Sequence, residues 1–567
     1  MSQHETPAPT TPRQLADQYV HACADLDPQV ATMLGLREHD DRVPDFSPEA
    51  QDAQDALDRR VLADLDALEE QTGPEGWDDL ERRCATLLRD RLGVSLECSE
   101  VGEHLRPLRN IGAPVHAVRN LFMMMPAESE QDWACIARRM SRFGDSYDSL
   151  MAALEEGRRR DLYAAPLQAQ TTIDQLGEWL QGEAGGDGSW FHDFVADGPE
   201  SLREGLTAAA DQAAQAVAGL RDYLDTTYLP AAQGTPDPCG EDRYRLSARR
   251  WMGADIEPHE VYQWGWAQFR ELDEQMREVA EQILPGSTPV EAMRHLDEHG
   301  KAVDGVEEVR VYLQKMMDGA IAELDNTHFD IAEPIRTVEA RIAPAGSAAA
   351  PYYSRPSVDF SRPGRTWLPT LGETRFPLYD LVSTWYHEGV PGHHLQLAQW
   401  AYVAPQLSLY QTSLGSSSGA TEGWALYAER LMDELGYLDT EERMGYLDCQ
   451  MMRAIRVVID LGMHLQLTIP DDSPLAPGQT WTPELATEFF DQHCGRSRSF
   501  IESEIVRYLG WPGQAISYKL GERAWLTGRE AAQRAHGDDF DLKAWHMAAL
   551  SLGALGLDDL QAELSRL

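Results

Sequence analysis

Basic residues are in short supply in this chain, and lysine is almost missing. Only four lysines occur, at positions 301, 315, 519 and 543. The 49 basic residues are outnumbered by 94 acidic ones, so the formal net charge is −45. A surface this negative repels phosphate groups and anionic lipid heads, so we expect neither nucleic acid nor membranes as partners. The acidity itself is typical of a solubility trait.

Cysteines and long apolar stretches are also scarce. The seven cysteines are scattered and never form a CxxC pair, which argues against a disulfide framework and a cysteine zinc site. No run of about 18 apolar residues occurs, so no membrane-spanning helix is expected. The polar segment Met1–Arg13 lacks the apolar core of a secretory signal. These features predict a cytoplasmic protein with reduced thiols.

Helical periodicity dominates what is present. Apolar residues recur three and four positions apart over 48–70, 200–226, 258–283 and 306–324. A chain of 567 residues exceeds what one hydrophobic core usually organises, and Pro/Gly-rich breaks fall near 229–240. The expected organisation is a disordered tail at 1–13, an N-terminal helical lobe at 14–230 and a catalytic helical lobe at 241–567.

The character of the sequence changes near residue 330. Ile335, Val338 and Ile342 alternate with charged residues, and the stretch 344–369 is rich in Gly, Pro, Ser and aromatic residues. This pattern predicts a short strand and a small sheet near 330–370. Helices are then expected at 378–402, 420–436, 440–467, 482–494, 514–536, 541–552 and 557–566.

The segment 386–394 reads YHEGVPGHH and carries the chemistry. A hydrolytic zinc site needs neutral imidazoles, a carboxylate, an open position for water and a base near that water. In helical zinc sites two histidines four residues apart bind the ion, and the glutamate after the first is the base. Here His387 and Glu388 are present, but position 391 is proline, and the next histidines are His393 and His394.

Ligands six residues apart on a regular helix would lie about 9 Å apart along its axis and point in different directions. They can share an ion only if the helix is broken between them. Pro391 and Gly392 are where we expect that break, because proline removes a backbone donor and clashes with the preceding turn. We favour His393 over His394 as the second ligand, since a Gly-His pair closes related motifs in helical zinc peptidases.

The third ligand is expected from a nearby helix. The small-residue run 416–421 can approach closely and cap a helix, and EGWALYAE follows it at 422–429. We choose Glu422 as the ligand, with Glu429 as a hydrogen-bond partner of a ligand histidine. The alternatives are a packed polar cluster for the histidines, and a first-turn glutamate interacting with the helix dipole for Glu422.

In these motifs the chain resembles the bacterial "domain of unknown function 885" family. The resemblance rests on YHEGVPGHHLQ at 386–396, EGWALYAE at 422–429, RAIRVVIDLGMH at 453–464 and PGQAISYKLG at 512–521, and it runs over nearly the whole chain. It implies a mainly α, two-lobed, zincin-like peptidase fold similar to zinc oligopeptidases and carboxypeptidases. A deep central cleft is part of that fold, while no substrate is implied.

The expected reaction is the hydrolysis of peptide bonds in short peptides, with a water activated by Zn²⁺ and by Glu388 as general base. A second donor for the oxyanion is sought among His464, Tyr518 and Tyr508. For His464 and Tyr518 the alternatives are a surface ion-pair face and a core tyrosine.

Substrate recognition is predicted from three features. The strand near 335–342 offers an edge for strand addition, and Arg456 or Arg507 could clamp a substrate carboxylate, as in a carboxypeptidase. Tyr353 is expected to line the same cleft, with an ordinary packed loop as the alternative.

Three other functions stay open from the sequence. The same zinc and Glu388 could hydrolyse a non-peptide amide or ester. Two histidines and a carboxylate also form the iron site of non-haem oxygenases, although an oxygenase has no need of Glu388. A non-catalytic binding protein could keep the same fold. The sequence leaves the oligomeric state and the substrate open.

Overall fold

The computed structural model describes residues 9–73, 76–182, 188–344 and 350–567. Over these residues the chain is mainly helical with a few short strands, which confirms the predicted α class. The zincin-like arrangement within that class stays a prediction. Of the tail expected at 1–13, residues 1–8 lie outside the described part, and the first helix begins at Pro12. Among the described residues, no helix is long and apolar enough to cross a bilayer.

The chain divides into two compact units. The first comprises residues 1–77, 92–239 and 506–511, and the second comprises 78–91, 240–505 and 512–567. Two helices run through a boundary between them: α4 (Asp79–Glu100) and α22 (Arg498–Gly510). Each unit is described by itself below.

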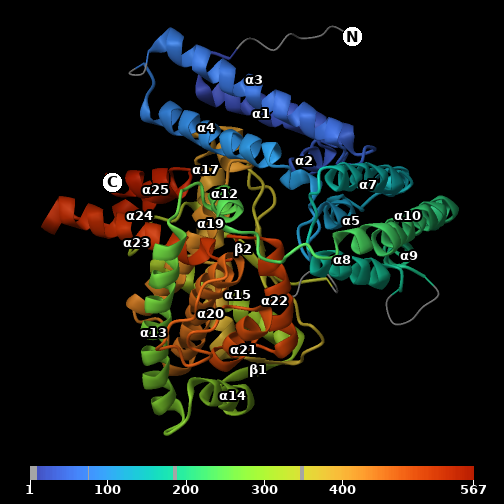
Figure 1. The fold of residues 1–567 in the computed structure, drawn as a ribbon. Helices are drawn as coiled ribbons and strands as arrows, with labels where there is room; N and C mark the ends of the chain where they lie inside the picture. Colours follow the sequence, from blue (N-terminus) through green and yellow to red (C-terminus); the bar gives the residue numbers. More distant parts are fainter. Residues whose placement is uncertain (1–8, 74–75, 183–187, 345–349) are drawn as a thin grey trace. The chain divides into compact units, whose positions relative to one another are not determined.

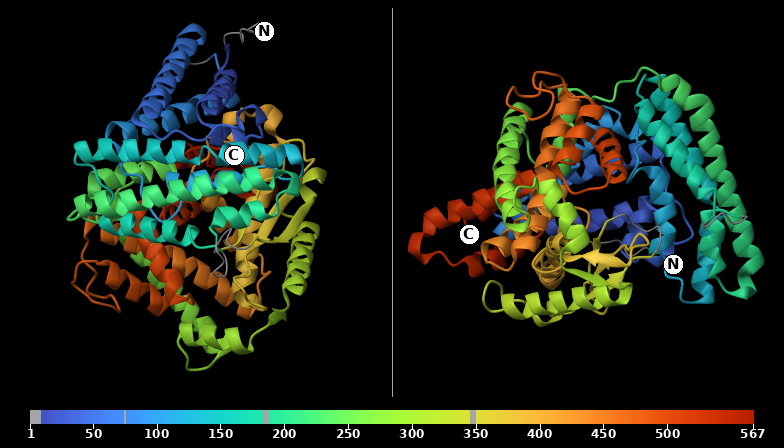
Figure 2. Two further views of the ribbon diagram at one scale, coloured as in Figure 1. Left: turned by 90° about the vertical axis from the view of Figure 1, so that its right-hand side faces the viewer. Right: turned by 90° about the horizontal axis from the view of Figure 1, so that it is seen from below.

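In the first unit, α6, α7, α8 and α9 pack around α10, while α1 packs against α3 (Figures 1 and 2). Buried aromatic rings, among them Phe122, Phe143 and Tyr147, fill its core. Prolines in the first turn and capping side chains such as Ser47 and Ser129 begin several of its helices. Its helices are α1 (Pro12–Leu26), α2 (Pro28–Met33), α3 (Pro48–Thr72), α5 (Pro114–Met124), α6 (Glu130–Met140), α7 (Phe143–Arg159), α8 (Pro166–Trp179), α9 (Trp190–Ala196), α10 (Arg203–Tyr223) and α11 (Leu229–Ala232).

The second unit holds the remaining helices and all the strands assigned in the described ranges. Its helices are α12 (Glu241–Met252), α13 (Pro258–Ile283), α14 (Pro289–His299), α15 (Val306–Leu324), α16 (Leu378–Glu388), α17 (His393–Tyr402), α18 (Leu409–Thr412), α19 (Ser418–Glu434), α20 (Thr440–Leu465), α21 (Pro483–His493), α23 (Ser517–His536), α24 (Leu542–Leu550) and α25 (Leu557–Leu564). The predicted helices at 258–283 and 306–324 match α13 and α15 residue for residue.

Helix α20 is the centre of the second unit, because every residue from Met444 to His464 is buried. Helices α13 and α16 pack along it, and α19 packs on α23. The α19–α23 contact brings backbone against backbone: a Cβ atom added to Gly423 would lie 2.5 Å from the carbonyl carbon of Gly521. Since only glycine allows this approach, the start of α19, which carries Glu422, has a fixed position against α23.

The predicted sheet forms in the expected stretch. Strand β2 (Val338–Ile342) pairs in parallel with β4 (Gly364–Leu368), and β3 (Tyr352–Ser354) pairs antiparallel with the other side of β4. The free edge of β2 is covered by Gln314 of α15, whose side chain bonds the carbonyl of Val338 and the amide of Ala340 at 2.9 and 2.8 Å. The sequence predicted that a peptide substrate could pair with the edge of this strand, but in the structure Gln314 already bonds that edge of β2.

A second, two-stranded sheet leads into the helix that carries the first histidine. It pairs β1 (Ala302–Asp304) with β5 (Arg375–Pro377), and α16 starts directly after β5. The amide of Leu378 donates to the carbonyl of Lys301 at 2.8 Å, which ties the first turn of α16 to this sheet.

Candidate metal centre

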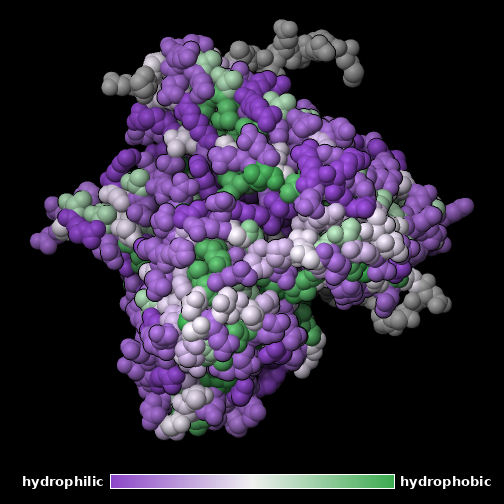
Figure 3. Space-filling view, viewed as in Figure 1, coloured by the Kyte–Doolittle hydropathy of each residue, from purple (hydrophilic) through white to green (hydrophobic). Residues whose placement is uncertain are grey.

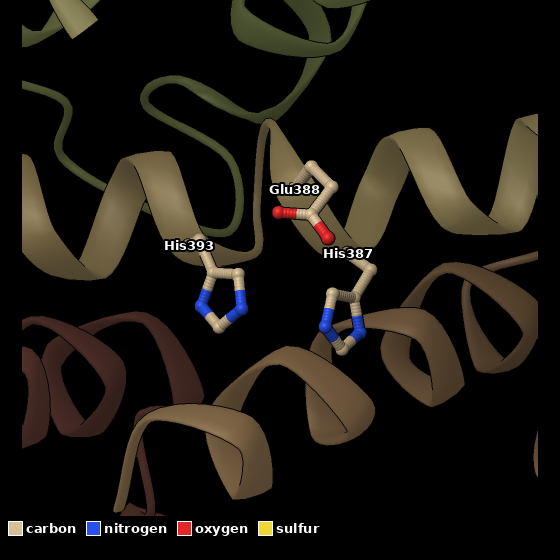
Figure 4. Close-up of side chains that lie close together, drawn as sticks. All are labelled: His387, Glu388 and His393. Atoms are coloured by element: carbon tan, nitrogen blue, oxygen red, sulfur yellow. The ribbon is translucent and has the colours of Figure 1, made fainter. Parts of the chain in front are cut away.

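The segment 378–402, predicted as one helix with a break, is two helices. α16 ends at Glu388, and α17 begins at His393. The four residues between them include a cis Val390–Pro391 peptide bond. Figure 4 shows that His387 on the last turn of α16 and His393 on the first turn of α17 point their imidazoles to the same side.

Close backbone contacts hold this connection in place. Gly392 lies so near the end of α16 that an added Cβ would overlap the carbonyl oxygen of His387. The indole of Trp424, from α19, donates to the carbonyl oxygens of Pro391 and Gly392 at 2.9 and 3.1 Å. The helix that carries Glu422 therefore also anchors the loop between the two histidines.

Three donor atoms converge at this point. Oε2 of Glu422 lies 3.3 Å from Nε2 of His387 and 3.6 Å from Nε2 of His393. A tetrahedral zinc ion with bonds of about 2.0–2.1 Å has its ligand atoms about 3.3 Å apart. The spacing and the donor types suit a divalent cation. The side chains are 5%, 12% and 22% exposed for His387, His393 and Glu422, so the group is recessed but open to solvent on the Glu422 side.

Glu388 completes the cluster. It offers a carboxylate oxygen that, with one ring nitrogen each of His387 and His393, forms a set whose atoms all lie within 4.8 Å of one another. This is the position that a general base for a coordinated water would take.

The far side of His387 is also fixed by hydrogen bonds. Its Nδ1 lies 2.7 Å from Oε1 of Glu429, so the ring donates from Nδ1 and keeps the lone pair on Nε2 for an ion. Ser383 donates to the other oxygen of Glu429 at 2.8 Å, and the guanidinium of Arg453 lies 3.7 Å from Oε1.

The electrostatics show an excess of buried negative charge. Burial raises the pKa of Glu388. For Glu422 burial acts in the same direction, but bonds to both histidines hold its pKa well below the usual value. Burial opposes the charging of His387, yet Glu422 and Glu429 raise its pKa to about 10. Glu422 and Glu388 on one side of His387 and Glu429 on the other therefore favour positive charge at this point.

His394 faces away from this cluster. Its Nε2 lies 2.7 Å from the carbonyl oxygen of Ile335, which can only accept, so Nε2 carries the proton. Its Nδ1 therefore accepts from the hydroxyl of Tyr353 at 2.9 Å. Because both of its nitrogens form hydrogen bonds, His394 links α17 to the three-stranded sheet. Tyr353 was expected to line the substrate cleft, but its hydroxyl is bonded to His394.

The residues proposed for oxyanion and carboxylate recognition lie in different surroundings. Tyr518 is half-buried, with its ring centre 4.9 Å from the guanidinium carbon of Arg456 and 5.9 Å from that of Arg453. Arg456 itself is buried and bonds Glu504 at 2.7 Å. Tyr518 is thereby connected to the cluster through Arg453 and Glu429, whereas Arg456 already has a carboxylate partner.

His464 and Tyr508 are both fully buried. His464 packs against the ring of Tyr244 and lies 3.7 Å from Asp460. It is eleven residues beyond Arg453 on α20, which amounts to about 16 Å along the axis. Tyr508 belongs to the first unit, with residues 506–511.

The sequence did not predict two residues that support the cluster. Trp424 and Ser383 act through hydrogen bonds to a loop and to a carboxylate that are distant in sequence, and neither residue type is typical of a metal site. The position of Trp424 within the EGWALYAE motif, two residues after Glu422, was the available hint.

The chain is similar to proteins of one known family. The profile of a family described as "Bacterial protein of unknown function (DUF885)" matches residues 28–564. No curated protein matches the chain.

Solved structures share the fold. A "putative lipoprotein" from Colwellia psychrerythraea is similar with a TM-score of 0.79 and 23% identity, covering 98% of this chain and 99% of the other. A "putative lipoprotein of unknown function" from Shewanella oneidensis is similar with a TM-score of 0.73 and 17% identity, again covering 98% and 99%. At these identities the likeness concerns the fold alone.

Proposed function

The chain belongs to the DUF885 family, and from the geometry of its histidine–glutamate cluster we propose that it is a zinc-dependent hydrolase of peptide bonds in short peptides. One observation carries the proposal. Glu422 lies at the spacing of a zinc ligand from both His387 and His393, and Glu388 offers a further carboxylate oxygen beside the two histidines, to which we assign the role of base.

We assign each residue of the cluster a role in the proposed hydrolysis. A bound zinc ion supplies a Lewis acid that acidifies water and polarises a carbonyl group. Glu388 takes the proton of the attacking water and returns it to the leaving nitrogen. Glu429 holds His387 in the tautomer that leaves Nε2 free. Tyr518 is our candidate donor to the oxyanion, and we leave the buried His464 out of the reacting group.

Short peptides are the proposed substrates because the cluster is recessed and its residues are those of hydrolytic zinc sites. We propose no carboxylate clamp at Arg456, since Glu504 already occupies that guanidinium. A non-peptide amide or ester would require the same zinc and the same base, so the nature of the substrate is a question for the assay. A cytoplasmic location remains part of the proposal.

The decisive experiment compares Glu388→Gln with the unchanged chain. The full-length protein is incubated with zinc and a library of unblocked peptides of two to six residues, and the products are read by mass spectrometry. We expect Glu388→Gln to keep its zinc and lose turnover, because the ligands remain and the base is gone. Glu373→Gln, the same change at an exposed position on the loop before β5, should behave as the wild type.

The outcomes separate the alternatives. Cleavage that persists in Glu388→Gln would refute the base assigned here. Zinc retention with no cleavage of any peptide, but hydrolysis of amide or ester metabolites, would replace the substrate and keep the mechanism. Iron in the purified protein together with oxygen consumption would favour an oxygenase.

A further inference from the structure

A second pair of histidines lies on α14, outside the cluster described above. His295 and His299 are four residues apart on one face of this helix, and their rings stack at 4.7 Å between centroids with an interplanar angle of 10°. The segment reads HLDEH. Two histidines at this spacing on one helical face are a common arrangement for binding one metal ion.

One hydrogen bond indicates the tautomer of His299. Nδ1 of His299 lies 3.3 Å from the carbonyl oxygen of His295. Because a carbonyl oxygen only accepts, this contact places the proton on Nδ1 and leaves the lone pair of Nε2 outward. Because the rings are nearly parallel, at least one of the two side chains must turn to a different rotamer before both imidazoles can bind one ion.

The pair opens onto a cavity of about 420 Å³. Gln282 at the end of α13 and Thr440 and Glu441 at the start of α20 line it together with both histidines. One carboxylate oxygen of Glu441 accepts a hydrogen bond from the backbone amide of Lys301 at 3.0 Å. The cavity therefore contains two imidazoles, a carboxylate and neutral oxygen donors, with room for water to complete the coordination.

The charge around the pair also favours a cation. A carboxylate oxygen of Glu298 lies 3.8 Å from Nδ1 of His299. The net charge of −45 raises the local concentration of divalent cations at the surface. The visible face of the molecule is mostly hydrophilic (Figure 3).

We propose that His295, His299 and Glu441 form a second binding site, for a divalent first-row transition metal such as zinc. The ion connects α14 to the first turn of α20, the helix at the centre of the second unit. The role is structural: the bound ion holds the α13–α14 connection against α20. The site is independent of the proposed hydrolase and does not require it.

Zinc stoichiometry tests the proposal. Full-length protein is stripped with a chelator and dialysed against zinc at neutral pH, and bound metal is counted by mass spectrometry. We expect two equivalents in the wild type, one in His295→Ala/His299→Ala, one in His393→Ala and none when the three changes are combined. His259→Ala removes an exposed histidine elsewhere in the second unit and should leave two.

A thermal readout separates binding from a folding defect. In the His393→Ala protein, zinc should raise the unfolding temperature, and His299→Gln, a change at a side chain that is 60% exposed, should remove that rise. The proposal is overturned if the double variant binds as many equivalents as the wild type, or if zinc leaves the unfolding temperature of His393→Ala unchanged. Failure of the cluster at 387–422 would show differently, as His393→Ala keeping the full wild-type stoichiometry.

Discussion

Replacing Gly392 with alanine perturbs the connection between the two histidines without touching any donor atom. A Cβ at this position would overlap the carbonyl oxygen of His387 and lie 2.6 Å from its carbonyl carbon. Ordinary carbon contacts are about 3.5–4.0 Å, so the start of α17 must move by about 1 Å. Metal–ligand distances tolerate only about 0.2 Å.

Two magnitudes follow from that displacement. Overpacking of this size lowers the free energy of unfolding by about 1–3 kcal/mol, and misplacing a catalytic group by about 1 Å lowers the rate about 100-fold. We expect Gly392→Ala to fold, to bind zinc weakly and to lose most peptide hydrolysis. Urea unfolding, zinc competition with a chelator and the peptide assay measure the three effects.

Gly319→Ala is the matched control. Gly319 lies inside α15 with no atom within 4 Å of an added Cβ, so alanine should stabilise the protein by up to about 1 kcal/mol and leave zinc binding unchanged. If Gly392→Ala bound zinc as tightly as the wild type, the inference that this backbone contact sets the spacing of His387 and His393 would be wrong.

Three further changes test the surroundings of the cluster. Glu429→Gln should weaken zinc binding about 10–100-fold, measured by chelator competition, because the bond that orients His387 loses its charge; unchanged affinity would remove Glu429 from the site. Trp424→Phe removes the indole bond to the carbonyl oxygens of Pro391 and Gly392, of which the second keeps the amide of Gln396 at 3.2 Å; it should cost about 1–3 kcal/mol of unfolding free energy in urea, whereas a neutral result would mean that water replaces the indole. His394→Ala should lower the thermal stability through two lost hydrogen bonds yet keep the zinc stoichiometry at 387–422, and loss of zinc would make it a ligand after all.

The helical class, most of the helices expected in the second unit and the break at Pro391–Gly392 followed from local rules. Apolar periodicity marks α13 and α15 because those helices bury one face, and proline stops α16 because it cannot continue the hydrogen-bond ladder. The sequence missed α22, whose apolar residues show only a weak helical stripe. It also expected a strand to start near Ile335, which lies in a 3₁₀ turn before β2.

The Gly-His pair favoured His393 over His394, but local pattern could not show what His394 contacts instead. What engages His394 is a backbone carbonyl and a tyrosine hydroxyl that are 59 and 41 residues away in sequence. The burial of His464 has the same origin, since its neighbours come from α12 as well as from its own helix. The contacts of His394 and the burial of His464 depend on tertiary packing, which cannot be predicted from periodicity and residue spacing.

The backbone contact between Gly423 and Gly521 has a consequence for how the protein is made. Nearly a hundred residues separate these glycines, so during synthesis α19 leaves the ribosome long before α23 can lie against it. A nascent chain that stops short of α23 would carry both histidines and Glu422, but without the surface that positions the start of α19. The metal binding proposed here should therefore follow the packing of α23 on α19, and chains truncated before residue 517 should be released from the ribosome without bound metal.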